Sequence, residues 1–183
     1  METILASSSP RRARLLRKVV RIFSVKPARI GERLLRGESF PRACVRLAEA
    51  KARSVARKAR GAVIIGADTI AYRGKKAYRK TDSASAARRI LLELSGRTHY
   101  VATGVCVVFP SGKCVKYCVR AAVKMKKLTP KILEWYVASG EWRGRAGSYD
   151  VSGRGARLVA EVQGEKETVV GLPLKRLKLI LGK

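Results

Sequence analysis

The chain has 183 residues, of which 46% are hydrophobic and 6% aromatic, so it is long enough for one domain with an aliphatic core. Lys and Arg number 41 against 13 Asp and Glu, a formal net charge of +28, which points to anionic partners rather than to a particular fold. No run of about 20 apolar residues is present, which excludes a membrane-spanning helix. The opening residues lack the basic region and cleavage site of a secretory signal. We therefore expect a cytoplasmic protein with a single domain over residues 1–183.

The first part of the chain alternates short apolar runs with helical periodicity. Pro10 stands where a first helical turn would begin, directly after Ser7-Ser8-Ser9. The elements expected here are a strand at Ile4–Ala6, a helix from Arg11, a strand at Ile22–Val25, a loop at Pro27–Glu38 and a long helix at Pro41–Ala59.

The middle of the chain opens with a continuous apolar run, Ala62–Ala67, which is typical of a central strand buried on both faces. Asp68 and Thr69 are expected at its carboxyl end. The elements expected after it are a helix at Ser83–Leu94, a hairpin of Tyr100–Phe109 and Cys114–Met125, a helix at Lys131–Ala138 capped by Thr129, a loop at Gly144–Gly155 with a short strand around Tyr149–Val151, a strand at Arg157–Val162 and a helix from Leu172 to about Leu181. This alternation predicts an α/β fold with a mixed β-sheet flanked by helices.

The cysteines and the single histidine do not suggest a metal site. Cys106, Cys114 and Cys118 are spaced by eight and four residues, unlike the close pairs of zinc sites. On one strand, Cys114 and Cys118 would lie about 13 Å apart, too far for a disulfide. We interpret the thiols, with Cys44, as small buried residues in a reducing compartment, and His99 as structural.

The segment from Ser7 to Arg12 has the composition of an anion site. It offers hydroxyls, the backbone N–H groups of a helix start and two guanidinium groups. An ordinary serine N-cap beside surface arginines would have the same sequence. This pattern alone therefore leaves open whether the segment is an anion site or only a helix cap.

Asp68 is the strongest single candidate for chemistry, because open α/β sheets bind ligands where strands end. It could serve as a general base or hold a metal ion, or it could be a plain polar strand terminus. Glu32 lies in a loop and could be a second ligand or a solvated ion-pair partner. Lys51 and Lys80 are further candidates, although any one lysine in so basic a chain could belong to the surface.

At these segments the sequence resembles the Maf family, whose fold is like that of the inosine triphosphatases. Six blocks match in order: Ile4–Arg12, Leu47–Ala52, Ile65–Thr69, Leu94–Val105, Ala146–Tyr149 and Val169–Leu174. The resemblance implies two lobes around a central cleft, a homodimer, and hydrolysis of the α–β phosphoanhydride of nucleoside triphosphates with Mg²⁺ or Mn²⁺.

The resemblance also implies roles for individual residues. The catalytic set would be Asp68, Glu32, Lys51 and Lys80, with the two carboxylates as metal ligands. The substrate-binding set would be Ser7, Ser9, Arg11, Arg12, Thr69 and Ser152. Such a set is coherent, because phosphoryl transfer depends on positioning and on charge stabilisation by metal and cations.

The sequence departs from the family pattern at three places. Arg79-Lys80-Thr81 replaces the usual Gly-Lys-Pro, Gly144-Arg145 replaces Asp-Lys, and Ser152 stands where a glutamine is frequent. Arg11 and Thr69 resemble the branch acting on dTTP and UTP, whereas Ser152 fits neither that branch nor the one acting on 7-methyl-GTP. The alternative function is a polyanion- or nucleic-acid-binding protein on a Maf-like scaffold, and weak polyanion binding would accompany either.

Overall fold

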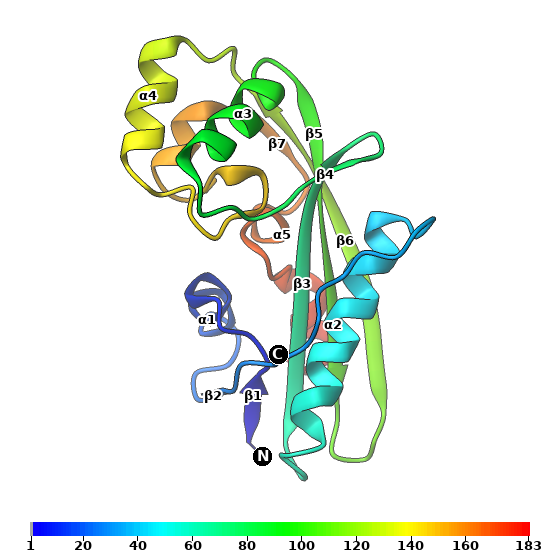
Figure 1. Cartoon of the computed structure of the whole chain (residues 1–183). Helices are drawn as coiled ribbons and strands as arrows, with labels where there is room; N and C mark the ends of the chain where they lie inside the picture. The colour runs from blue at the N-terminus through cyan, green and yellow to red at the C-terminus, as the bar shows by residue number, and fades with distance from the viewer. Residues whose placement is uncertain (1) are drawn as a thin grey trace. The chain divides into compact units, whose positions relative to one another are not determined.

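The computed structural model describes residues 2–183, which form a mixed seven-stranded sheet flanked by helices (Figure 1). The strand order is β2-β1-β3-β5-β6-β7, and β4 pairs with β3 outside this path. The α/β prediction is therefore confirmed. The chain divides into two compact units, the first made of the residues up to Thr69, Ala102–Val119 and Gly171–Lys183, the second of Ile70–Val101 and Arg120–Val170.

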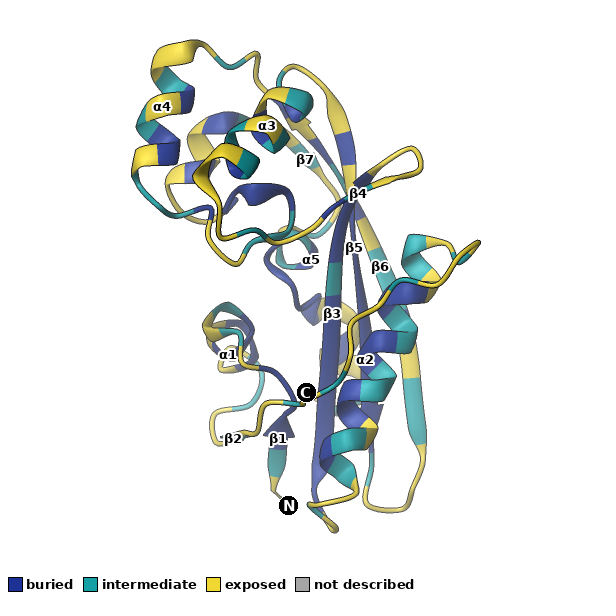
Figure 2. Cartoon of the chain, in the orientation of Figure 1, coloured by how far each residue is buried: buried dark blue, intermediate teal, exposed yellow. Residues whose placement is uncertain are grey.

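The first unit contains the parallel part of the sheet. Strand β1 (Thr3–Leu5) lies between β2 (Ser24–Val25) and the start of β3 (Val63–Arg73), with Leu5 opposite Ile65. The unit also contains parts of β5 (Thr98–Val108) and β6 (Cys114–Met125), and the helices α1 (Pro10–Leu16), α2 (Phe40–Ala56) and α6 (Leu174–Ile180). Figure 2 shows β3 buried along almost its whole length, as its continuous apolar run predicts.

Two glycines allow α2 to lie unusually close to the sheet. A Cβ atom at Gly66 would overlap the carbonyl oxygen of Ala48 and stand 2.8 Å from the amide nitrogen of Ala52. A Cβ atom at Gly104 would overlap the backbone of Cys44. The backbones of β3 and β5 therefore contact the backbone of α2 directly, which only glycine permits.

The second unit contains the antiparallel pairs β3–β4 and β6–β7. Strand β4 (Lys76–Tyr78) forms a hairpin with β3, and β7 (Val159–Gln163) is antiparallel to β6. Its helical elements are α3 (Ala84–Leu94), α4 (Pro130–Ala138), η1 (Ala146–Ser148), η2 (Arg154–Leu158) and α5 (Lys166–Val170). Thr129 caps α4 as predicted, since its side chain accepts from Ile132 N and Pro130 occupies the first turn.

Several element boundaries differ from the predicted ones. The strand predicted at Ala62–Ala67 is part of the longer β3, so Asp68 lies inside a strand and not at its end. No strand forms around Tyr149–Val151, where Gly147 (φ 73°) and Ser148 (φ 59°) turn the backbone away from extended geometry. Helix α2 ends at Ala56, three residues early, and α5 and β4 were not predicted, because five- and three-residue elements carry too little periodicity.

His99 is structural, as interpreted from the sequence. It is fully buried, its Nε2 lies 2.9 Å from the hydroxyl of Tyr149, and the two rings pack edge to face. Among residues 2–183, no helix is long and apolar enough to cross a lipid bilayer.

Candidate active site

The loop between β1 and α1 is organised by its own serines. Ser9 caps α1, its hydroxyl accepting from Arg12 N at 3.4 Å, while Ser9 N donates to the hydroxyl of Ser7 at 3.2 Å. Pro10 follows the cap at the first helical position, as predicted. The local sequence thus fixes a helix start with backbone N–H groups beside two hydroxyls, the geometry that binds anions.

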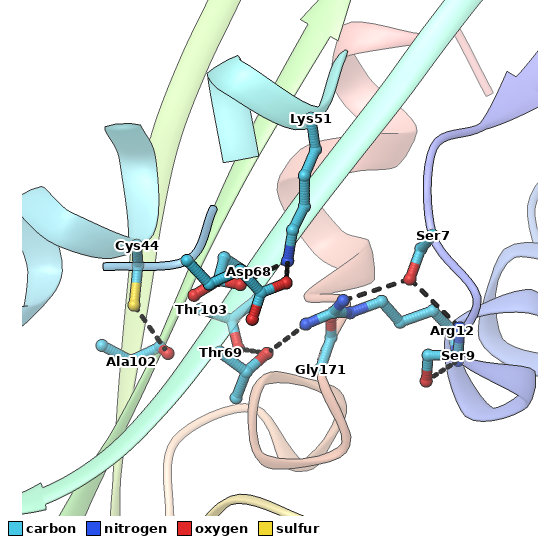
Figure 3. Close-up of polar contacts among 11 residues, drawn as sticks. Ser7, Ser9, Arg12, Cys44, Lys51, Asp68, Thr69, Ala102, Thr103 and Gly171 are labelled. Atoms are coloured by element: carbon cyan, nitrogen blue, oxygen red, sulfur yellow. Dashed lines mark hydrogen bonds and ion pairs between the residues drawn. The ribbon is translucent and has the colours of Figure 1, made fainter. Parts of the chain in front are cut away.

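Arg12 is the centre of a buried hydrogen-bond network in the first unit (Figure 3). Its Nη1 donates to Ser7 Oγ at 3.1 Å and its Nη2 to Thr69 Oγ1 at 2.9 Å. Its Nε donates to the carbonyl oxygen of Gly171 at 2.8 Å. One guanidinium therefore joins the serine loop, strand β3 and the segment that precedes α6.

The burial of Arg12 has an electrostatic consequence. Desolvation lowers the pKa of Arg12, and the negative charges of Asp68 and Glu32 partly offset this effect. The guanidinium remains protonated, since its ordinary pKa lies far above neutrality. The network thus places a fixed positive charge beside the carboxylates.

Thr69 extends this network to the neighbouring strand. Its hydroxyl accepts from Arg12 and lies 3.0 Å from the hydroxyl of Thr103 on β5. Gly171, with φ at 121°, leaves space for both groups, because an added Cβ would stand 3.2 Å from Arg12 Nε and from Thr69 Oγ1. Sequence reasoning singled out neither Thr103 nor Gly171. A polar residue inside the apolar run of β5 was the available signal for Thr103.

Lys51 connects two carboxylates. Its Nζ atom lies 2.6 Å from Asp68 Oδ1 and 2.6 Å from Glu32 Oε1. The Lys51 and Asp68 side chains are buried, at 7% and 8% exposure, whereas Glu32 is 42% exposed. The close contact of α2 with β3 brings Lys51 within reach of Asp68. The ion pairs of Lys51 therefore depend on the glycines that allow this contact.

The remaining predicted residues take different places. Arg11 is half-buried in the first turn of α1. Lys80 and Ser152 belong to the second unit, where both are exposed. Lys80 follows β4, and Ser152 donates its N–H to Asp150 Oδ1 at 2.9 Å. The first unit thus brings together Ser7, Ser9, Arg12, Glu32, Lys51, Asp68 and Thr69. The roles of these residues, and those of Arg11, Lys80 and Ser152, stay predictions.

The carboxylate pair suits a hard divalent cation. Asp68 and Glu32 each place an oxygen 2.6 Å from the Lys51 ammonium, so the two carboxylates lie near each other and already share one cation, the lysine itself. Within residues 2–183, no group of three or more His, Cys, Asp or Glu side chains is clustered for metal binding. Two carboxylates nevertheless fit Mg²⁺, which keeps several waters and takes further oxygens from substrate phosphates.

The chain is similar to known proteins over nearly its full length. The family model for Maf-like proteins matches residues 2–183. A dTTP/UTP pyrophosphatase from Moorella thermoacetica is 44% identical over 97% of this chain and 92% of its own. A nucleoside triphosphate pyrophosphatase from Anaplasma marginale (strain Florida) is 40% identical, over 97% of this chain and 91% of its own.

The fold also resembles a solved structure. The Ham1 protein of Staphylococcus aureus superimposes with a TM-score of 0.50 at 14% identity, covering 69% of this chain and 73% of that one. This likeness concerns the fold. The match to the family model, the 40–44% identities and the placement of the family's motif residues around Arg12 and Lys51 lead to one conclusion: the chain belongs to the Maf family.

Proposed function

We propose that this protein is a nucleoside triphosphate pyrophosphatase, which hydrolyses a triphosphate and water to a nucleoside monophosphate and pyrophosphate. The observation that carries the proposal is the buried Lys51 ammonium, 2.6 Å from both Asp68 and Glu32 and beside the Arg12 network. Positive groups and paired carboxylates in one place are what hydrolysis of a phosphoanhydride requires. The identities to pyrophosphatases add independent support.

The acidic and the basic residues of the site would have different roles. Asp68 and Glu32 would hold a Mg²⁺ or Mn²⁺ ion, which, when bound, neutralises phosphate charge and polarises the scissile bond. The serine loop and the start of α1 offer N–H groups and hydroxyls to phosphate oxygens, and Arg11 adds a cation there. Asp68 accepts the proton of the attacking water at its carboxylate. Lys51 keeps that carboxylate oriented and supplies positive charge to the phosphates.

The finer parts of the proposal concern substrate, assembly and location. The dTTP/UTP pyrophosphatases among the relatives favour pyrimidine or modified pyrimidine nucleotides. We propose further that Lys80 and Ser152 contribute to substrate binding and that the protein is a homodimer. Four free cysteines fit a reducing cytoplasm.

The test is pyrophosphate release from a panel of canonical and modified triphosphates, with Mg²⁺ or Mn²⁺ in excess. The wild type is expected to release pyrophosphate, fastest from dTTP and UTP, and Asp68→Asn to lose about 100-fold or more in kcat. A wild type no faster than Asp68→Asn on every triphosphate would contradict the proposed activity. Lys80→Ala and Ser152→Ala in the same assay test those two residues.

A further inference from the structure

The β5–β6 hairpin carries two thiols in contact. Phe109 N donates to Lys113 O at 2.9 Å, which closes the hairpin around the turn between them. In that register, Cys106 and Cys114 are diagonal neighbours on one face of the two strands. Their Sγ atoms lie 3.2 Å apart, so one thiol donates to the other. An S–S bond would bring the two sulfurs about 1 Å closer together.

The two sulfurs differ in access. Cys106 is fully buried in a core cluster with Ala48 and Ala52 of α2, whereas Cys114 packs at the edge of that cluster and is partly exposed. Burial raises the pKa of the Cys106 thiol above its usual range, so Cys106 remains protonated. An oxidant in solution therefore meets Cys114 first.

Two cations surround the accessible thiol. Arg53 and Lys116 both bind Glu49, each at 2.8 Å, and both lie within electrostatic range of Cys114. The site thus combines an accessible sulfur, nearby cations and a second sulfur in contact behind it.

We propose that Cys106 and Cys114 form a reversible oxidation site, which closes an intramolecular disulfide when a peroxide or oxidised glutathione reaches Cys114. With hydrogen peroxide, the Cys114 sulfur attacks one oxygen, the O–O bond breaks, and a sulfenic acid and water result. The Cys106 sulfur then attacks the Cys114 sulfur, the S–O bond breaks, and the departing hydroxide takes the Cys106 proton as a second water. Two thiols and one peroxide thus give one disulfide and two waters. With oxidised glutathione, the Cys114 sulfur breaks the glutathione S–S bond and releases one glutathione thiol, and the Cys106 sulfur then displaces the second, so the two cysteine protons leave on the two glutathione thiols. A dithiol reductant reverses the oxidation.

The other two cysteines are engaged elsewhere. Cys44 Sγ donates to the carbonyl oxygen of Ala102 at 3.3 Å, and Cys118 Sγ lies 3.8 Å from the carbonyl oxygen of Val119. Cys118 shares strand β6 and partial exposure with Cys114, so Cys118→Ser is a matched control for Cys114→Ser.

The experiment treats the whole protein with hydrogen peroxide or with oxidised glutathione, blocks the remaining thiols under denaturing conditions, and maps the peptides by mass spectrometry without reduction. The wild type and Cys118→Ser are expected to lose two hydrogens and to yield a peptide that links Cys106 to Cys114. Dithiothreitol restores the starting mass. Cys114→Ser yields no such peptide.

A thermal melt provides a second measurement. Closing the short hairpin loop is expected to raise the melting midpoint of the wild type and of Cys118→Ser by about 5 °C, and to leave Cys114→Ser unchanged. The proposal is overturned if the oxidised wild type carries only a sulfinic acid or a glutathione adduct at Cys114, or links Cys44 or Cys118. The peptide map of the oxidised wild type tests the proposal even if the variants fail to fold. Its result does not depend on whether the protein releases pyrophosphate.

Discussion

Lys51 illustrates how much a single side chain carries in this site. It is buried against Asp68, and its charge is balanced by Asp68 and Glu32 together. Removing one member of such a group leaves an uncompensated buried charge, which costs more than the intact pair contributes. The residue therefore bears on stability as well as on the proposed phosphate binding.

The Lys51→Met variant is expected to lower the free energy of unfolding by about 3 kcal/mol, because the buried Asp68 side chain would lose its ion-pair partner. Urea denaturation at neutral pH measures the loss, and Lys58→Met, at an exposed position just after α2, serves as the control. The double variant Lys51→Met/Asp68→Leu should recover part of the stability. If the double variant lost the sum of the stabilities that the two single variants lose, this would argue against an energetic coupling of Lys51 and Asp68.

Arg12→Lys is expected to lower kcat/KM by about 100-fold while the protein stays folded. Lysine keeps the charge but cannot donate at once to Ser7, Thr69 and Gly171 as the guanidinium fork does. Steady-state pyrophosphate release measures the effect. Arg14→Lys, exposed on the same helix, should retain full activity, and equal losses in both variants would remove the special role of Arg12.

From the sequence alone, the site residues that belong to short local motifs can be predicted. The segments around Ser9, Lys51 and Asp68 were recognisable because their neighbours in sequence are informative. Thr103 and Gly171 lie in matching blocks but were not singled out, because their contacts are with Thr69 and Arg12, far away along the chain. A block alone does not tell which of its residues makes such a distant contact.

The contact of helix α2 with strands β3 and β5 depends on two glycines, Gly66 and Gly104. Gly66→Ala is expected to lower the free energy of unfolding by about 2 kcal/mol or more, since its Cβ would overlap the backbone of Ala48. It should also reduce activity, because α2 would move and carry Lys51 with it. Chemical denaturation and pyrophosphate release are the two measurements.

Gly31→Ala is the matched control for this helix–sheet contact, because an added Cβ at Gly31 meets nothing within 4 Å and its φ is not left-handed. Its stability should match the wild type. A Gly66→Ala protein as stable as Gly31→Ala would show that α2 packs less tightly than the structure indicates.

His99 on β5 is hydrogen-bonded to Tyr149, the residue directly after η1, and this pair makes the stability of the protein depend on pH. Burial lowers the pKa of His99 to about 4, so the folded state favours neutral imidazole. Between the unfolded pKa of about 6.5 and the folded value, the unfolded chain binds more protons. The stability from this group is therefore complete above pH 6.5 and is lost as the pH falls towards 4.

The expected loss from His99 across this window is about 3 kcal/mol, measured as the free energy of unfolding at a series of pH values. His99→Gln lacks the titrating group, so its curve should be flatter between pH 6.5 and 4, even if it is less stable throughout. Parallel curves for the two proteins would contradict the burial of a neutral histidine.

The elements themselves were predictable where apolar periodicity extends over several residues. The long helices and the buried strands appeared near their expected positions, whereas β4 and α5 were too short to be recognised. The position of Asp68 was misjudged because the polar pair Asp68-Thr69 ends the apolar run and so resembles the end of a strand, whereas β3 continues past it to Arg73.

For the whole molecule, the positive charge is unevenly divided between the units. The first unit holds 23 Lys and Arg against five Asp and Glu, and residues 3–31 contain no acidic residue. Its five carboxylates all have polar or cationic partners, so the excess charge faces solvent and should draw in anionic nucleotides.

Raising the salt concentration is therefore expected to lower kcat/KM for triphosphates by about threefold or more, at constant free Mg²⁺, through screening of this attraction. Reversing Arg14, Arg17 and Arg21 to Glu should weaken the salt dependence more than the same change at Lys124, Lys126 and Lys127 of the second unit, all six being exposed. If both triple variants changed the salt dependence of kcat/KM equally, the attraction of the nucleotide would depend on the net charge of the protein alone.

The hydrogen bond from Arg12 to the carbonyl of Gly171 has a consequence for the order in which the protein can be made. During synthesis the serine loop emerges well before Gly171, so the guanidinium of Arg12 lacks one of its acceptors until residue 171 has been translated. A nascent chain stalled before residue 171 would hold Ser7, Arg12 and Thr69 and still lack the carbonyl group that fixes Arg12 Nε. The hydrogen bonds of Arg12 are thus completed only after the serine loop and strand β3 have been made.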